Sequence, residues 1–576
     1  MIFISILTLI VAKALPVLST NISNAHFTRI TSIVFFFSSL LILNSLNLES
    51  IGSGLGIYSG FFHITQITQI LEFFLFIIGG LILISFAGVG DKNPENGRSN
   101  LCSKASGSQI GHKSYTTKES IIEVASVNAT DYSLIVLFSS LGSALLISSY
   151  DLISLYLSIE LQSFGLYILS TLYRESESST LAGLKYFLLG GLSSCIILLG
   201  AGLIYSYTGL TNLESLYILN SMSEGGLAVF GQTDFNQQYL IQGLSLGLIL
   251  IFIGFLFKIA AAPLHNWSPD VYDGTPTIVT IWLTIMPKLA ILILLLELHT
   301  QFGILPTQLD LYLTNLLPFP TNQVKFLLLI SSFLSLIIGS LLGLNQTKIK
   351  RLLAYSTISH IGFLLLALSI NTEQSIDSFI FYLLQYTLTN LNIFLIILAL
   401  SYSNINLKKS TFVLDLNYIL EFKGLFFSNP FLSLSLAISL FSMAGIPPLI
   451  GFFSKQFVLY SSIQNGYYFI SITAIIVSVI SASYYLKIIK LLFTLKKEVE
   501  EEESEHKSTK LSEIQTNKEV HNPMLKGEGR ETTTSLITNT HSFTISILTL
   551  TIVLFFIKPS LFLNSTQLLS LSLFFN

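Results

Sequence analysis

The sequence is poor in charged residues and has almost no net charge. Only 11% of its 576 residues are Asp, Glu, Lys or Arg, whereas a soluble protein carries about 25%. So few charges cannot cover the surface of several water-facing domains. The 51% hydrophobic content and the mean hydropathy of +0.71 instead indicate a polytopic membrane protein. A net charge of −3 excludes a nucleic-acid binder that relies on overall basicity.

Cysteine is also scarce. Cys102 and Cys195 are too few for a disulfide framework, a four-cysteine zinc site or an iron–sulfur cluster held by this chain alone. The glycine-rich piece at 52–56 lacks the G-x-G-x-x-G spacing of a dinucleotide site. We therefore predict that the chain itself binds no cofactor or metal, and that any redox chemistry belongs to partner proteins.

Long apolar stretches dominate the sequence. A membrane-crossing helix takes about 20 residues, because backbone polar groups in lipid must bond within the segment. About fourteen such stretches predict an all-α integral membrane fold. The first of them contains Lys13 and no small-residue cleavage site, so we expect a retained helix rather than a signal peptide. The predicted spans are 2–19, 28–45, 67–89, 132–149, 151–173, 181–206, 239–263, 276–298, 324–344, 350–370, 376–402, 431–459, 465–489 and 539–557.

Basic residues are distributed unevenly between the predicted loops. Of the 29 lysines and arginines, 22 fall in alternate connections, and the other connections contain only Lys325 and Lys558. This asymmetry follows the positive-inside rule and supports the number of spans, because a wrong number would mix the two sets of loops. An even number of spans places both termini on the side that is poor in positive charge.

Five basic residues remain, all inside predicted spans. A charge at mid-bilayer costs about 2.5–3.5 kcal/mol on insertion scales, so four buried lysines and Glu160 would together cost on the order of 12–17 kcal/mol if unpaired. Such residues persist only if they are paired, hydrated or partly neutral. A lysine can exchange its proton, as a proton relay requires, whereas arginine stays charged. The five are Lys13, Lys185, Lys258, Lys288 and Lys455.

Several of these ionisable residues also have a structural interpretation. Lys13 is expected to reach a membrane interface, and Glu72 to make a contact between helices. Glu160 and Lys185 are candidates for a static ion pair between adjacent helices, and His360 for a packing histidine. Lys258, Lys288 and Lys455 have no evident fixed partner in the sequence, which favours a functional role.

Proline interrupts two of the predicted helices. Pro263 follows Lys258 in the seventh span, and Pro447 and Pro448 precede Lys455 in the twelfth. A helix broken within a membrane is tolerated where it is buried in protein or lines a watery cavity. Broken helices at matching places in two halves point to a transport site.

The two halves share a weak common offset. Lys455 lies 197 residues after Lys258, and Gly362 lies 197 residues after Gly165. We therefore predict two five-helix repeats, spans four to eight and nine to thirteen, the second inverted because each contains an odd number of spans. The predicted division is three N-terminal transmembrane helices (1–89), a polar loop (90–131), the first repeat (132–298), the second repeat (324–489), a charged insert (490–538), and a C-terminal helix with its tail (539–576).

Three segments resemble the signature of the antiporter-like subunits of respiratory complex I and of Mrp-type sodium/proton antiporters. They are KIAAAPLHNWSPDVYDGTPTIVTIWLTIMPKLA at 258–290, RLLAYSTISHIGF at 351–363 and AGIPPLIGFFSKQFVL at 444–459. The likeness extends over spans four to thirteen. Lysine rather than glutamate at position 455, and the wording PDVYDG after the broken helix, are most similar to one particular complex I member.

The resemblance implies a subunit that moves protons and binds no NADH, FMN, iron–sulfur cluster or ubiquinone, all of which are expected in partner subunits. In the family, a glutamate of the fifth helix pairs with a lysine of the sixth, and lysines of the seventh, eighth and twelfth helices carry the proton. A polar residue of the tenth helix lies in the connecting path. By position, the implied relay residues are Glu160, Lys185, Lys258, Lys288, Lys455 and His360.

The implied partners are other membrane-arm subunits of the complex, namely antiporter-like, small and accessory subunits, together with phospholipids. The 44 Phe against 2 Trp are typical of AT-rich mitochondrial DNA, and indicate the mitochondrial inner membrane of a fungus or protist. The positive loops would then face the matrix, and both termini the intermembrane space.

Three alternatives stay open. An Mrp-type cation/proton antiporter subunit would use the same lysines. A scaffold that moves no ion gains nothing from the insertion cost of those lysines. A quinone enzyme is disfavoured because the sequence contains no redox-site constellation.

Overall fold

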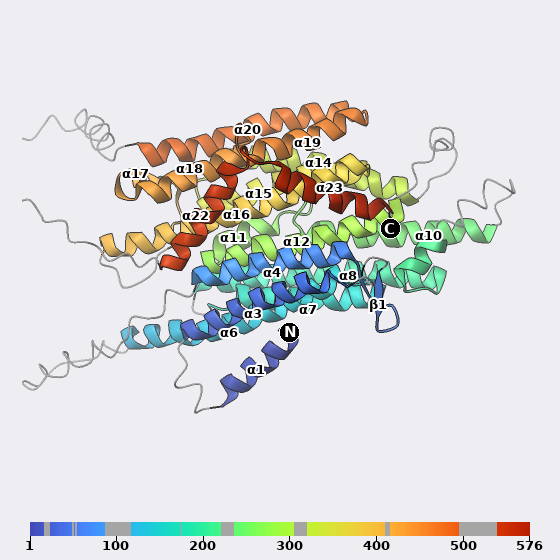
Figure 1. Ribbon diagram of the computed structural model, residues 1–576, viewed down its shortest axis with the longest axis horizontal. Coiled ribbons are helices and arrows are strands. Elements are labelled where there is room, and N and C mark those ends of the chain that lie inside the picture. Colours follow the sequence, from blue (N-terminus) through green and yellow to red (C-terminus); the bar gives the residue numbers. More distant parts are fainter. Residues whose placement is uncertain are drawn as a thin grey trace, which may run out of the picture.

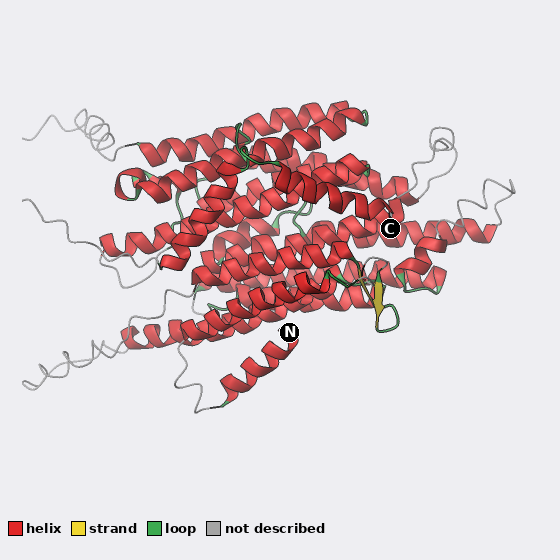
Figure 2. Ribbon diagram, in the orientation of Figure 1, coloured by secondary structure: helices red, strands yellow, loops and turns green. Residues whose placement is uncertain are grey.

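In the part of the chain that it describes, the computed structural model consists of helices and loops, with one short hairpin of strands (Figure 2). Each helix satisfies its own backbone hydrogen bonds, as a segment inside lipid must. The residues that the structure describes are 1–15, 24–48, 51, 54–86, 117–173, 176–219, 235–303, 320–408, 415–494 and 538–575.

The chain runs through its elements in a simple order. The first half contains α1 (Ile2–Ala14), α3 (Asn24–Ser45), β1 (Leu55–Ile57), β2 (Phe62–Ile64), α4 (Gln66–Phe86), α6 (Thr117–Ile147), α7 (Leu152–Ser170), α8 (Glu177–Thr208), α10 (Phe235–Lys258), α11 (Trp267–Gly274) and α12 (Thr277–Gly303). The second half contains α14 (Pro320–Leu344), α15 (Ile349–Ile370), α16 (Glu373–Lys408), the 3₁₀ helix η2 (Ile419–Phe422), α17 (Leu425–Ser428), α18 (Pro430–Ala444), α19 (Ile450–Gln464), α20 (Tyr468–Phe493), α22 (Asn539–Leu554) and α23 (Ser560–Phe575).

The helices coincide with the predicted spans. Within the described ranges, nine helices are long and apolar enough to cross a membrane, and five shorter apolar helices accompany them. Each predicted span overlaps one of these helices, and the twelfth extends over both α18 and α19. Most of the predicted polar loop and of the charged insert, at 87–116 and 495–537, lies outside the described residues.

The long helices lie side by side and form an elongated bundle, with α12, α15 and α16 in its middle (Figure 1). The apolar windows of α12 and α15 are each 94% buried and that of α16 is 89% buried, whereas those of α8 and α20 are only 33% buried. The middle helices therefore contact protein almost all round. The outer helices present apolar side chains outward, as a lipid-facing surface requires.

Helices α7 and α15 each begin beside an isolated β-bridge, at opposite ends of the bundle. Asp151 caps α7 and forms an isolated β-bridge with Asn212, and Lys348 precedes α15 and forms one with Tyr418. The first junction adjoins the β1–β2 hairpin, because the backbone N–H of Tyr150 donates to the carbonyl of Phe61. Figure 1 shows that hairpin and α17, which follows the second junction, at opposite ends.

The two interrupted helices end through the same hydrogen-bond pattern, a few residues before their prolines. After α10, Ala260 has a left-handed φ of 62° and the Ala261 N–H donates to the Leu256 carbonyl at 2.9 Å. After α18, Gly445 has a φ of 86° and the Ile446 N–H donates to Phe441 at 3.2 Å. In each case the N–H bonds to the carbonyl five residues earlier. This bond satisfies a carbonyl that would otherwise lack a partner at the helix end.

The offset of 197 residues does not extend to these breaks. The left-handed residues 260 and 445 are 185 apart. Lys258 is the last residue of α10, before its break, whereas Lys455 lies inside α19, after the other break. The two lysines therefore occupy non-equivalent places, and their alignment as repeat partners was wrong. The stretch from α15 to α18 is shorter than the stretch from α7 to α10. A constant offset between the two halves therefore does not exist, and the spacing of the lysines did not show this.

Candidate functional site

Glu160 and Lys258 form an ion pair in the first half of the bundle. Glu160 lies in the middle of α7, and Lys258 ends α10, where the negative end of the helix dipole favours an ammonium. The Glu160 Oε1 and Lys258 Nζ atoms are 3.7 Å apart, and the side chains are 15% and 7% exposed. Neither atom has a hydrogen-bond partner among the described residues. The pair is therefore close enough to attract and too far apart to satisfy both groups.

Lys185 does not pair with Glu160, so that expectation was wrong. Its ammonium contacts the Asp270 carboxylate on α11, and Asp270 also accepts from Arg351 at 2.9 Å. The Lys185 side chain is 42% exposed. It lies in the third turn of α8 and reaches the end of the bundle that holds α11. The sequence contains two lysines, Lys185 and Lys258, on helices that neighbour α7. Only the directions of their side chains in the folded bundle decide which of them pairs with Glu160.

A small cavity adjoins Lys258 between α7, α8, α10 and α12. Its wall includes Gln162, Tyr167, Trp267 and Pro287. The buried Oε1 of Gln162 has no hydrogen-bond partner among the described residues. Pro287 stands inside α12 and removes one backbone donor from that helix. The cavity wall therefore includes both Lys258 and Gln162, whose buried Nζ and Oε1 atoms lack a hydrogen-bond partner among the described residues.

Lys288 is fully buried in the middle of the bundle. Its side chain donates to the Thr357 hydroxyl of α15 at 3.0 Å, and its Nζ lies 5.4 Å from the centre of the Tyr272 ring. No carboxylate within ion-pair distance of Lys288 is found in the described part of the chain. A hydroxyl and an aromatic face stabilise an ammonium less than a carboxylate does.

His360 lies one turn beyond Thr357 on α15. Its Nδ1 is 2.7 Å from the Tyr382 hydroxyl, and its Nε2 is 3.3 Å from the Tyr485 hydroxyl. The ring is 97% buried and links three helices, α15, α16 and α20. Both ring nitrogens therefore have a hydroxyl partner that can donate or accept.

Lys455 contacts the end of the broken helix α18. Its Nζ donates to the carbonyls of Met443 and Ala444, each at 2.9 Å, and lies 5.9 Å from the Phe363 ring. These are the last carbonyls of α18, which carry the negative end of that helix dipole. The break therefore supplies the partner of this lysine, in place of an acidic side chain.

The expected relay residues thus fall into connected groups. Glu160 and Lys258 form an ion pair, the cavity beside Lys258 reaches Pro287 on α12, and α15 carries both the partner of Lys288 and His360. Lys13 lies apart and pairs with Asp131 near the N-terminus. Sequence reasoning missed several members. Thr357 and His360 are spaced i, i+3 in TISH, which indicates a polar face of α15. Asp270 lies in the PDVYDG motif but has no feature that marks it as a partner of Lys185, and nothing in the sequence pointed to Tyr382 or Tyr485.

The described residues contain no group of three or more His, Cys, Asp or Glu side chains that would hold a metal ion. The chemistry that this arrangement supports is exchange of protons between lysines, a carboxylate and an imidazole within the bundle.

Comparison with known proteins defines the class. Residues 149–481 match the family described as the transmembrane region of NADH:quinone oxidoreductase and Mrp antiporter. The chain belongs to this family of antiporter-like membrane proteins.

Within that family, the similar proteins include the complex I member that the sequence most resembled. NADH-ubiquinone oxidoreductase chain 2 of Rhizopus oryzae is 46% identical over 578 residues, which cover 100% of both chains. The protein of the same name from Marchantia polymorpha is 38% identical over 64% of this chain and 68% of its own length. NADH-quinone oxidoreductase subunit N of Rhodospirillum rubrum is 34% identical over 63% of this chain and 67% of its own.

Solved structures share the fold. A chain of respiratory complex I from Thermus thermophilus superposes with a TM-score of 0.63 at 22% identity, and covers 98% of this chain and 99% of its own. A chain of the Mrp complex from Dietzia sp. superposes with a TM-score of 0.68 at 16% identity, and covers 98% and 96%. The predicted all-helical, antiporter-like membrane fold is confirmed.

Proposed function

We propose that the chain is a proton-translocating membrane subunit of an NADH:ubiquinone oxidoreductase of the mitochondrial inner membrane. The full-length relative at 46% identity supports the assignment to this complex. The observation that carries the proton role is the Glu160–Lys258 pair, which is buried at 3.7 Å with unsatisfied atoms on both sides. A purely structural ion pair would be expected to close to hydrogen-bond distance and to satisfy its atoms.

In this proposal the proton passes along one hydrated row. Lys185 and its Asp270 partner lie nearest to the aqueous side, and Glu160 and Lys258 form the loading pair. Lys288 then receives the proton through water in the cavity beside Pro287. The unsatisfied oxygen of Gln162 in the cavity wall supports such water, because buried polar groups without a protein partner are usually bonded to ordered water.

The second half of the row uses α15. Lys288 connects through Thr357 to His360, and His360 to Lys455 across the Tyr382 hydroxyl and the intervening rings. Stacking of Phe363 on Tyr382, with ring centres 5.8 Å apart, leaves a short apolar gap before Lys455. Water must cross that gap for conduction, which makes it the natural position of a gate.

The Glu160–Lys258 contact couples the relay to distant redox chemistry. Two unit charges 3.7 Å apart attract by about 4 kcal/mol at an effective dielectric constant near 20. Moving one charge across 100 mV takes about 2.3 kcal/mol. A rearrangement in a partner subunit that draws Glu160 away must supply the free energy of that attraction. It destabilises the protonated Lys258 by more than moving one charge across a membrane potential of that size takes, and so drives the proton forward.

The proposal includes the sidedness of the chain and its repeat structure. We infer that about fourteen helices cross the membrane, the nine long and the five shorter apolar helices. The positive loops face the matrix and both termini the intermembrane space. The matched junctions before α7 and α15, at opposite ends of the bundle, support two inverted repeats related by an axis in the membrane plane.

The proposal assigns no redox cofactor to this chain. NADH, FMN, iron–sulfur clusters and ubiquinone belong to partner subunits, and the neighbours of this chain are other membrane-arm subunits and phospholipids. An Mrp-type antiporter subunit would use the same lysines. The full-length relative favours the respiratory complex, and co-purification with NADH-oxidising activity separates the two functions.

Replacing Lys258 tests the relay. In sealed membranes that contain the assembled complex, Lys258→Met should abolish this subunit's proton transfer, and the measured proton-to-electron ratio should fall while the amount of complex is kept. Lys258→Arg should behave like Lys258→Met, because arginine keeps the charge but does not release its proton.

Lys13→Met is the matched control. It removes a lysine from a predicted span, but one that pairs with Asp131 outside the row, and it should leave the proton-to-electron ratio unchanged. An unchanged ratio in Lys258→Met would refute the proposed relay.

A further inference from the structure

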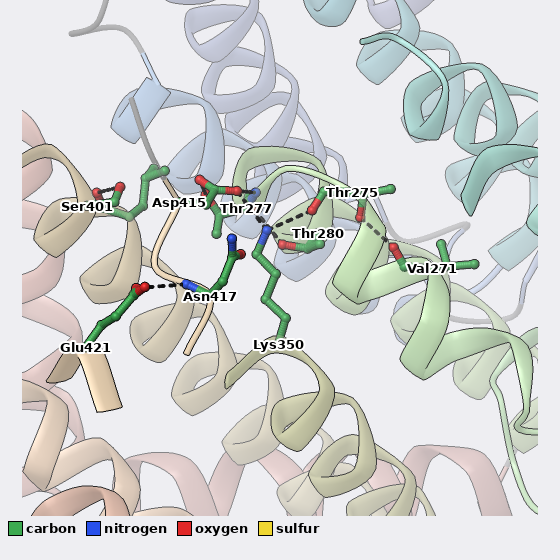
Figure 3. Close-up of polar contacts among 10 residues, drawn as sticks. Val271, Thr275, Thr277, Thr280, Lys350, Ser401, Asp415, Asn417 and Glu421 are labelled. Atoms are coloured by element: carbon green, nitrogen blue, oxygen red, sulfur yellow. Dashed lines mark hydrogen bonds and ion pairs between the residues drawn. The ribbon is translucent and has the colours of Figure 1, made fainter. Parts of the chain in front are cut away.

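A second polar connection joins the helices that carry Lys288 and Thr357. It consists of Lys350 on α15, Asp415 in the segment before η2, and Thr275 and Thr277 at the start of α12 (Figure 3). None of these four residues was singled out by the sequence. The connection lies at the end of the bundle where α12 and α15 begin.

Asp415 caps α12 from a distant part of the chain. Its Oδ2 accepts from the Thr277 N–H and its Oδ1 from the Thr277 hydroxyl, each at 3.0 Å. The first N–H groups of a helix have no partner within the helix. Pro276, which precedes α12, has no side-chain acceptor and so cannot cap it. The carboxylate therefore satisfies an open donor and also faces the positive end of the α12 dipole.

Lys350 links the Asp415 carboxylate, and so the start of α12, to α15. Its Nζ donates to Asp415 Oδ2 at 2.7 Å and to the Thr275 carbonyl at 2.8 Å, and its side chain is only 3% exposed. A buried ammonium with two good acceptors is costly to displace, because removing one partner leaves an uncompensated charge. The segment that contains Asp415 is also bonded to the start of α15, since the backbone N–H of Ile349 donates to the carbonyl of Asn417 at 2.9 Å.

The helical period aligns this connection with the relay. Thr277 and Lys288 are eleven residues apart on α12, about three turns, and Lys350 and Thr357 are seven apart on α15, about two turns, so each pair shares one helix face. The two helices are therefore joined at two levels, first by Lys350–Asp415–Thr277 and then, deeper, by Lys288–Thr357. The Lys350–Asp415–Thr277 contacts fix the rotation of α12 about its axis and its position along that axis. The 3.0 Å hydrogen bond between Lys288 and Thr357 depends on both.

We propose that Lys350 and Asp415 are positioning residues that hold Lys288 in register with Thr357. The inference rests on the proposed function, because it assigns them to the proton step at Lys288. They touch neither Lys288 nor the proton path. Their effect is transmitted by the rigid first turns of α12 and α15.

The experiment uses the assembled complex in sealed membranes, with proton pumping measured per electron and per amount of complex. Asp415→Ala should lower the proton-transfer rate of this subunit by about tenfold or more, as expected for misplacement of a reacting group by about 1 Å. Asp415→Glu keeps the carboxylate and should restore most of the rate. Asp131→Asn, which breaks the more exposed Lys13–Asp131 pair, should leave pumping unchanged.

A double variant separates positioning from general damage. If Asp415 acts through the Lys288–Thr357 bond, Asp415→Ala combined with Thr357→Val should pump no worse than Thr357→Val alone. Additive losses, or normal pumping in Asp415→Ala, would overturn the inference. Lys288→Met distinguishes the two levels of the proposal: normal pumping in that variant defeats the relay itself, whereas its loss together with normal pumping in Asp415→Ala defeats only the positioning role.

Discussion

Each buried lysine of the row has a different kind of partner. Lys258 faces a carboxylate at 3.7 Å, Lys288 a hydroxyl at 3.0 Å, and Lys455 two backbone carbonyls at 2.9 Å. Only the first of these partners carries a full negative charge. Opening the Glu160–Lys258 contact would therefore leave all three lysines with neutral acceptors, so that no lysine of the row keeps a charged partner.

Removing the Thr357 hydroxyl should slow proton transfer at Lys288. Thr357→Val keeps the side-chain shape but leaves the Lys288 ammonium without its hydrogen-bond acceptor. A hydrogen bond to a charged group contributes about 1.5–3 kcal/mol, so the pumping rate should fall by about tenfold to a hundredfold. Thr357→Ser retains the hydroxyl and should pump nearly normally. Equal loss in both variants would contradict a specific role of the hydroxyl, because Thr357→Ser retains it.

The sequence identified the ionisable residues but not their pairing. A lysine or glutamate in an apolar span stands out because of its insertion cost. Whether Glu160 meets Lys185 or Lys258 depends on the rotation of three helices about their axes. That rotation is set by packing between helices distant in sequence, which the spacing of residues within one helix does not contain.

At the level of elements, the two helix breaks create the environment of the lysines. The join between α18 and α19 is tight, because a Cβ built at Gly451 would lie 1.8 Å from the Ser442 carbonyl oxygen. Only glycine allows the two half-helices to approach in this way. The approach in turn brings the end of α18 within reach of the Lys455 ammonium.

Gly451→Ala should separate α19 from α18. We expect the resulting overpacking to cost about 1–3 kcal/mol, to lower the temperature at which the complex loses activity, and to reduce pumping by weakening the contacts of Lys455. Gly191→Ala on α8 is the control, since nothing lies within 4 Å of its added Cβ. Equal thermal stability of the two variants would show that the join tolerates the extra carbon.

The prolines correctly marked these two regions as interrupted, but not where the helices end. Proline destabilises the interior of a helix and disfavours helical backbone at the residue before it. The helices end earlier, at the left-handed residues Ala260 and Gly445. Alanine rarely adopts that conformation, so its position at the first break follows from the tertiary structure and not from its own preference.

For the whole molecule, burial separates the helices into a protein-enclosed middle and a lipid-facing outside. Both kinds have similar composition, because lipid and protein interior are equally apolar. For example, α8 and α12 have windows of hydropathy 2.2 and 2.3, but these windows are 33% and 94% buried. Hydropathy therefore identifies spans without locating them within the bundle.

Chemical labelling should verify the sidedness of the bundle. With Cys102 and Cys195 replaced by serine, a cysteine at Gln374 should react with a membrane-impermeant maleimide from the intermembrane space. A cysteine at Ser428 should react only when the matrix side is opened. Both positions are exposed, near the ends of α16 and α17. Reaction of both from one side would contradict the alternating loops that the basic residues predict.

The sequence by itself determined that this protein is a multi-helix membrane protein of the antiporter-like family, which residues are ionisable within its spans, and where two helices are interrupted. These properties depend on local composition and on motifs of neighbouring residues, which a single chain displays directly. Tertiary structure alone decided that Glu160 meets Lys258, that Thr357 meets Lys288, and that Asp415 caps α12 from outside. These contacts join segments tens to more than a hundred residues apart, and they depend on how helices rotate and slide against each other as they pack.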